Sequence, residues 1–122
     1  MLAFRLRLRF TPTALDEAVG VLRSLAGPVR AEPGCVATRL LQDVNDRQTL
    51  DYIEEWQDLE GFERHLRTAW FRTTLAVMEM AAGQPTVEID DIVSRRGFGR
   101  IEELLADGRA DSTTGGRAGV ST

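Results

Sequence analysis

The sequence predicts an α+β domain in which a four-stranded antiparallel sheet carries helices on one face. Residues 2–10 alternate between apolar and arginine positions, two further alternating runs lie close together near the middle of the chain, and apolar residues at helical spacing fill the intervals. The 122 residues are 43% hydrophobic and 28% charged, which suits one compact core.

The first strand is expected in "MLAFRLRLRF". Leucine and phenylalanine occupy every second position from Leu2 to Phe10, and Arg5, Arg7 and Arg9 stand between them. Side chains of a strand point alternately to its two faces, so this pattern predicts a strand with one buried face and one arginine-rich face.

A helix is predicted to follow the first strand. Pro12 is suited to a first helical turn and Thr13 to the capping position. Apolar residues then recur at helical spacing up to Leu25, and Gly27-Pro28 is expected to end the helix.

A hairpin is predicted next. The stretch "EPGC" is typical of a turn, and the alternating runs at 35–43 and 48–56 are joined by a short polar loop. These runs therefore indicate two neighbouring antiparallel strands.

The second helical region is expected in two parts, the first capped by Asp58 and the second by Thr68. Gly83 and Pro85 are expected to end it, before a last strand at 86–94. The residues predicted to face the core are Leu59, Phe62, Leu66, Trp70, Phe71, Leu75, Met78 and Ala82.

The resulting order is strand, helix, strand, strand, helix, strand, the ferredoxin-like βαββαβ arrangement. Residues 1–97 are predicted to form this domain and residues 98–107 a short amphipathic helix. The Gly, Ser and Thr content of residues 108–122 predicts a flexible tail.

Charge and composition exclude several functions. The net charge of −4 argues against nucleic acid as a partner, and no apolar run approaches the ~18 residues of a membrane span. The lone Cys35 and the absence of a C-x-x-C pattern argue against an internal disulfide and a zinc site, so no metal is expected. A cytoplasmic location fits these features.

The open face of the sheet is expected to be rich in ion pairs. The predicted topology places the arginine strand between the third and fourth strands, whose open-face residues include Asp51, Glu55, Glu88 and Asp90. We expect cross-strand pairs there, partly shielded by a second copy of the chain in a homodimer.

The stretch "IEEWQDLEGFERHLRTAWF", residues 53–71, resembles the signature of the antibiotic biosynthesis monooxygenase superfamily, a strand ending in Glu-x-Trp followed by a helix with a His-Leu step. "EPGC" before the second strand belongs to the same resemblance. It covers roughly residues 2–94 and implies a homodimeric α+β barrel with a cavity between sheet and helices. Catalytic members of that superfamily oxygenate quinols or polycyclic phenols without metal or flavin.

The resemblance implies a catalytic role for His65, Glu54 and Trp56 and no cofactor, with His65 as the base. The implied pocket for a small aromatic or hydrophobic molecule is lined by Tyr52, Phe62, Trp70, Phe71 and Met78. The match is incomplete. Quinol-oxidising members often have proline and a second histidine at the positions of Ala69 and Trp70. Polyketide-oxidising members have asparagine at the position of Tyr52 and tyrosine at that of Phe62.

Two interpretations of these residues remain open. In one, His65 handles a proton or ligand, and the protein is a cofactor-independent monooxygenase. In the other, His65 covers apolar surface and bonds a carbonyl or Glu54, while Tyr52 and Trp56 are core residues. The protein would then bind, or isomerise, a small hydrophobic metabolite. Under the first interpretation, His65→Ala is expected to leave the protein folded.

Overall fold

The computed structural model describes residues 1–113, and the side chains of residues 1–108. Residues up to Ile92 form one compact unit, and those from Val93 onward belong to a second. The elements of the first unit are β1 (Leu2–Arg9), α1 (Pro12–Arg30), β2 (Cys35–Gln42), β3 (Thr49–Trp56), α2 (Leu59–His65), α3 (Ala69–Glu79) and β4 (Thr86–Asp91).

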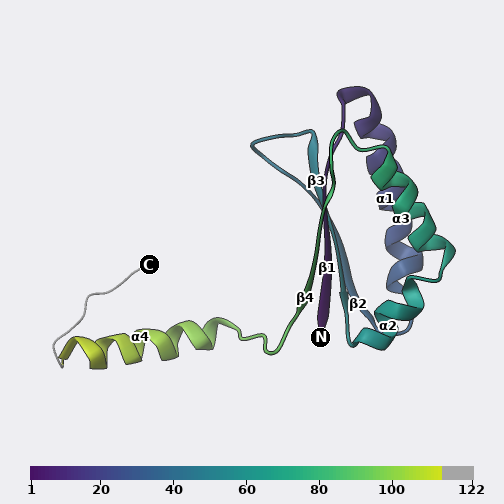
Figure 1. The fold of residues 1–122 in the computed structure, drawn as a ribbon. Coiled ribbons are helices and arrows are strands. Elements are labelled where there is room, and N and C mark those ends of the chain that lie inside the picture. Colours follow the sequence, from purple (N-terminus) through teal and green to yellow (C-terminus); the bar gives the residue numbers. More distant parts are fainter. Residues whose placement is uncertain (114–122) are drawn as a thin grey trace. The chain divides into compact units, whose positions relative to one another are not determined.

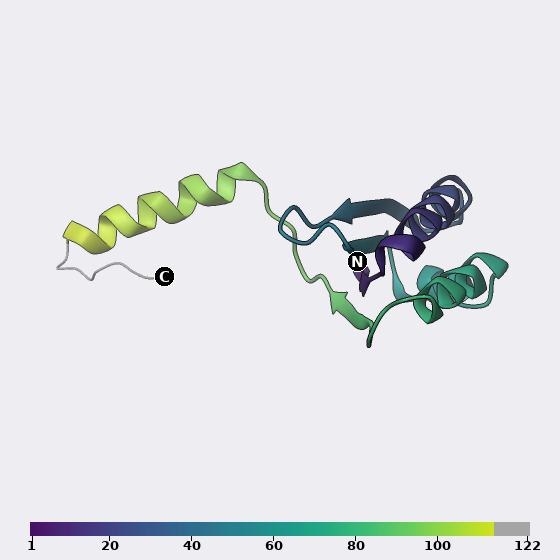
Figure 2. The ribbon, with the colours of Figure 1, turned by 90° about the horizontal axis from the view of Figure 1, so that it is seen from above.

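The strands form one antiparallel sheet in the order β2-β3-β1-β4. Helices α1, α2 and α3 lie on the same face of the sheet, as Figures 1 and 2 show from two directions. The predicted ferredoxin-like βαββαβ fold is therefore confirmed. The two central strands are β3 and β1, and Leu6 of β1 lies opposite both Tyr52 and Val87.

The core lies between the sheet and the three helices. The apolar side of β1 is fully packed: Leu6, Leu8 and Phe10 have no exposed surface. Burial of this alternating row drives the strand onto the helices, since each large apolar side chain stabilises the fold by about 1.5–3 kcal/mol. The other core residues are Leu2, Phe4, Ala18, Leu22, Leu25, Val29, Leu50, Tyr52, Trp56, Phe62 and Val77.

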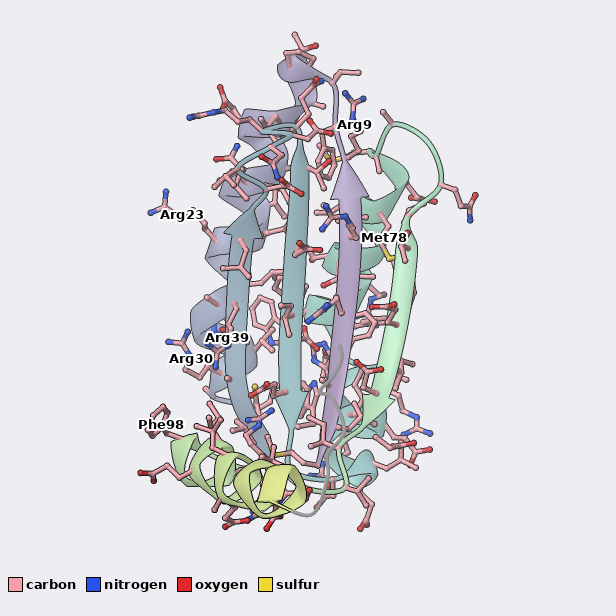
Figure 3. The ribbon with its side chains drawn as sticks, turned by 90° about the vertical axis from the view of Figure 1, so that its left-hand side faces the viewer. Arg9, Arg23, Arg30, Arg39, Met78 and Phe98 are labelled. Atoms are coloured by element: carbon pink, nitrogen blue, oxygen red, sulfur yellow. The ribbon has the colours of Figure 1, made fainter. Side chains whose placement is uncertain are left out.

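The opposite face of the sheet, which Figure 3 views directly, carries the arginines of β1. Arg7 donates to Asp51 on β3 at 2.7 Å and to Asp43, which follows β2, at 2.5 Å. Arg9 donates to Asp46 in the loop after β2 at 3.0 Å. Arg7 and Asp51 thus form one of the cross-strand pairs expected on this face, and the loop carboxylates add partners that strand alternation does not predict.

Helix α1 differs from the prediction at both ends. Its cap is Thr11, whose side chain accepts from the Ala14 amide, and not Thr13. The predicted stop at Gly27-Pro28 is wrong, because the helix continues to Arg30 with Pro28 inside its last turns. The stripe of apolar residues continues through Leu25 to Val29, which is fully buried, and this packing outweighs the one hydrogen bond that proline removes.

The second helical region is divided as predicted. The side chain of Asp58 accepts from the Gly61 amide at 2.9 Å, and that of Thr68 accepts from the Phe71 amide at 3.3 Å. Gly34, before β2, has a φ of 88°, which a residue with a side chain adopts only with strain.

The inward faces of α2 and α3 were predicted only in part. Phe62 is buried, but Leu59 is 56% exposed and Leu66 is 38% exposed. His65 takes the inward position beside Phe62. On α3 the residues facing inward include Thr74 and Val77, while Trp70 and Leu75 are exposed.

The second unit contains α4 (Phe98–Thr113). Residues 108–113, assigned to the tail from composition, are thus helical, and the rest of that predicted tail lies outside the described residues. None of the helices in residues 1–113 has the length and apolar character needed to cross a bilayer.

Candidate functional site

A buried carboxylate on β3 lies at the centre of the candidate site. Glu54 has no exposed surface. Its Oε2 accepts from the Tyr52 hydroxyl at 2.7 Å, and its Oε1 accepts from the Trp56 indole N–H at 3.1 Å. The three residues alternate along one strand and therefore share the face that meets the helices. The sequence predicted this shared face, and the structure confirms it.

His65, at the end of α2, completes the site from the helix side. It also has no exposed surface, and its ring lies between Trp56 and Phe71, with centroids 4.8 and 5.7 Å away. Nδ1 is 2.8 Å from Oε2 of Glu32. Nε2 is 3.1 Å from Oε2 of Glu54, within reach of an ion pair, although the angle is too poor for a hydrogen bond.

The two carboxylates favour the protonated form of the imidazole. Burial lowers the pKa of His65, but the nearby carboxylate of Glu54, followed by that of Glu32, more than offsets this effect. The pKa of His65 therefore lies above its ordinary value of 6.5. The pKa of Tyr52 is also raised, by burial and then by the charge of Glu54, so its hydroxyl stays protonated and donates to that carboxylate.

This raised pKa predicts a pH-dependent stability. The folded state binds the His65 proton more tightly than the unfolded chain, so the stabilisation is complete below about pH 6.5 and is lost as the pH rises through the folded pKa. Urea unfolding from about pH 6 to about pH 8, below the titration of the Cys35 thiol, should show the free energy of unfolding falling with pH. His65→Gln, which removes the only histidine, should flatten this fall. A free energy that rises across the window in the wild type contradicts the assignment.

The predicted pocket residues do not all lie in one place. Phe62 packs against Trp56 and Phe4, while Phe71 and Met78 are half-buried at the core. Trp70 is 40% exposed on α3. The catalytic candidates Glu54, Trp56 and His65 do meet, together with Tyr52.

Sequence reasoning missed Glu32. This residue lies in the turn between α1 and β2, and its side chain is 14% exposed. A turn has no periodicity from which the direction of a side chain can be read. The available signal was indirect: a lone inward histidine needs polar partners, and Glu32 begins the "EPGC" turn.

A groove with an apolar floor reaches this site from the α1 side. Two adjoining cavities, of about 220 and 260 Å³, lie between α1, β2 and β3 and share Arg23 and Leu40. We call them together the α1–β2 groove. Its residues are Val19, Leu22, Arg23, Ala26, Arg30, Thr38, Arg39, Leu40, Leu41, Gln42, Leu50 and Tyr52. Tyr52 thus belongs both to the groove and to the buried hydrogen-bond network.

Residues that could bind a metal are not grouped together in the described part of the chain. No three His, Cys, Asp or Glu side chains there are arranged to hold an ion. Cys35 is half-buried, and burial, followed by the charge of Glu54, raises the pKa of its thiol to about 11.

Comparison with known proteins gives consistent matches. Residues 1–77 match the family model described as antibiotic biosynthesis monooxygenase. A crystal structure of an antibiotic biosynthesis monooxygenase is 29% identical, with a TM-score of 0.68, over 77% of this chain and 100% of that one. A Pseudomonas aeruginosa protein is 27% identical, with a TM-score of 0.66, over 76% of this chain and 94% of its own.

A curated relative is more distant. An uncharacterized protein of Synechocystis sp. (strain ATCC 27184 / PCC 6803 / Kazusa) is 22% identical over 64 residues, which are 52% of this chain. The match spans only 44% of the length of that relative.

Proposed function

Because the chain belongs to the antibiotic biosynthesis monooxygenase family, we propose that it oxygenates a small aromatic or quinol-type molecule without a cofactor. The single observation that carries this proposal is the position of Tyr52. It lines the α1–β2 groove while its hydroxyl donates to the buried carboxylate of Glu54. The Tyr52 side chain therefore links the groove to the buried carboxylate.

The first step would be removal of a phenolic proton from the substrate. His65 has no exposed surface, so it reaches a substrate only through its neighbours. The Tyr52 oxygen would accept the substrate proton while its own proton passes to Glu54. When protonated, His65, 3.1 Å from Glu54, would hold this carboxylate in place.

The resulting phenolate would react with dioxygen, which is the oxidant. For a hydroquinone, one oxygen atom becomes a new hydroxyl group on a quinone product and the other leaves as water. The O=O bond, both phenolic O–H bonds and one ring C–H bond are broken, while one C–O bond and the O–H bonds of the new hydroxyl and of water form. The ring is oxidised overall by four electrons. The apolar floor of the groove, which includes Leu22 and Leu40, would limit access of water to the intermediates.

The test is oxygen uptake by the purified, chelator-treated protein with a panel of hydroquinones and anthrones. Tyr52→Phe removes only the hydroxyl and should lower the uptake rate by about a hundredfold, the usual size of a general acid–base contribution. Arg72→Gln, at an exposed position on α3, serves as the control and should retain the wild-type rate. Uptake that Tyr52→Phe leaves unchanged contradicts the proposed proton route.

A second function is favoured by the burial of His65. A fully enclosed histidine between two carboxylates also suits a protein that binds, or isomerises, a small hydrophobic metabolite. No uptake above background by the wild type, with binding in the α1–β2 groove, would support this function in place of the first.

The proposal includes a homodimer in the cytoplasm. Helices of residues 1–92 cover only one face of the sheet, so the open face is available to a second copy of the chain. A monomer mass in sedimentation equilibrium would contradict the dimer.

A further inference from the structure

The α1–β2 groove combines an apolar floor with three arginines. Leu22, Leu40 and Tyr52 contribute buried or half-buried surface. Arg23 and Arg30, seven residues apart on α1, lie on the same side of the helix, and Arg39 comes from β2. Figure 3 shows the three arginines along the β2 edge of the sheet.

These arginines lack acidic partners. Arg30 donates to the hydroxyl of Thr38 at 3.1 Å, and within the described side chains no carboxylate pairs with Arg23, Arg30 or Arg39. Arg7 and Arg9 of β1, by comparison, are each paired with aspartates. Although the chain has 19 acidic residues against 15 basic ones, the residues that line the groove include arginines and no acidic residue.

We propose that the α1–β2 groove binds an amphipathic carboxylate. The guanidinium groups of Arg23 and Arg30 would receive the carboxylate, and the apolar body would lie against Leu22, Leu40 and Tyr52. Arginine presents a planar fork of donors that matches the two oxygens of a carboxylate. The hydrogen bond from Arg30 to the Thr38 hydroxyl orients the Arg30 guanidinium group in the protein without ligand, which reduces the conformational entropy lost on binding.

The size of the groove limits the ligand to a small molecule. Cavities of about 220 and 260 Å³ together approach the volume of ordinary small-molecule sites. The inference rests on the proposed function for the location of the ligand. It adds that the substrate is a phenol that also carries a carboxylate, in place of a neutral phenol.

The first experiment is calorimetric titration of the full chain with 2-naphthoate and with 2-naphthamide, which has the same body without the charge. Naphthoate should bind at least about tenfold more tightly, as expected for a charge-assisted pair. Equal affinities, or no binding of naphthoate, would overturn the proposal.

Matched variants then locate the site. Arg23→Gln and Arg30→Gln should each weaken naphthoate binding by about tenfold and leave naphthamide binding unchanged. Arg72→Gln makes the same change of charge on α3 and should leave both affinities unchanged. If Arg72→Gln weakens naphthoate binding as much as the groove variants do, the effect is that of net charge alone and the proposal fails.

The outcomes separate this inference from the oxygenase proposal. Oxygen uptake with neutral hydroquinones, without any preference for naphthoate over naphthamide, overturns only the carboxylate site. Arginine-dependent binding of naphthoate without uptake of oxygen supports the carboxylate site and overturns only the oxygenase.

Discussion

Replacement of His65 by alanine is expected to lower the free energy of unfolding by about 3–5 kcal/mol, the range observed when one partner of a buried ion pair is removed. His65 has no exposed surface and lies 2.8 Å from Glu32 and 3.1 Å from Glu54. Its loss leaves the fully buried carboxylate of Glu54 with only the Tyr52 and Trp56 donors, and it opens a cavity beside Phe71.

Urea unfolding followed by circular dichroism would measure this loss. Glu63→Ala removes an exposed side chain from the same helix and serves as the control, with an expected change below about 0.5 kcal/mol. In a Glu54→Gln background, where the buried charge is absent, His65→Ala should cost about 0.5–3 kcal/mol less. A loss of less than about 1 kcal/mol of unfolding free energy in the wild-type background would contradict a buried ion pair between His65 and Glu54.

This expectation reverses the one drawn from the sequence. A histidine beside Phe62 on an amphipathic helix can be imagined at the rim of a pocket, where its removal would leave the protein folded. The structure shows His65 enclosed by aromatic rings and carboxylates, so the same substitution now tests stability first. Activity is better tested with Tyr52→Phe, which keeps the ring.

Replacement of Trp56 by alanine should have a comparable effect. Trp56 has no exposed surface, packs against Phe62 and His65, and donates to Glu54. Removal of a fully buried tryptophan costs about 3–5 kcal/mol, and here a buried carboxylate also loses a donor.

The chain contains a matched control for Trp56→Ala in its second tryptophan. Trp70 is 40% exposed, so Trp70→Ala should cost less than about 1 kcal/mol. Both variants can be compared by urea unfolding followed by circular dichroism, which does not depend on tryptophan emission. Equal losses for the two variants would show that Trp70 is also covered, for example by a second copy of the chain.

The fold was predictable because the strands have a strong period of two. Alternation along β1 assigned its two faces correctly, and the same pattern placed Tyr52, Glu54 and Trp56 on one side of β3. The caps at Asp58 and Thr68 were also readable, since short polar side chains at these positions satisfy free amides of the first turn.

The remaining features depend on tertiary contacts. The end of α1 was misjudged because a proline in the last turns costs little when Val29 beyond it is buried. The inward face of α2 was misjudged because hydropathy favours Leu59 and Leu66 over His65, whose burial is made possible by carboxylates from two other segments. The contact with Glu32 spans 33 positions in the chain and has no local signal.

The buried pair of Glu54 and His65 also specifies how β3 aligns with its neighbour. The inward residues Leu2, Phe4, Leu6 and Leu8 of β1 are all apolar, so a slip of two positions would still place apolar residues of β1 opposite the inward row of β3. Such a slip would carry the Glu54 carboxylate away from the imidazole, and a slip of one position would turn Glu54 outward and Glu55 inward. The pair therefore helps to select one strand register as well as to stabilise the fold. Only in the native register of β3 does the core contain no unpaired charge.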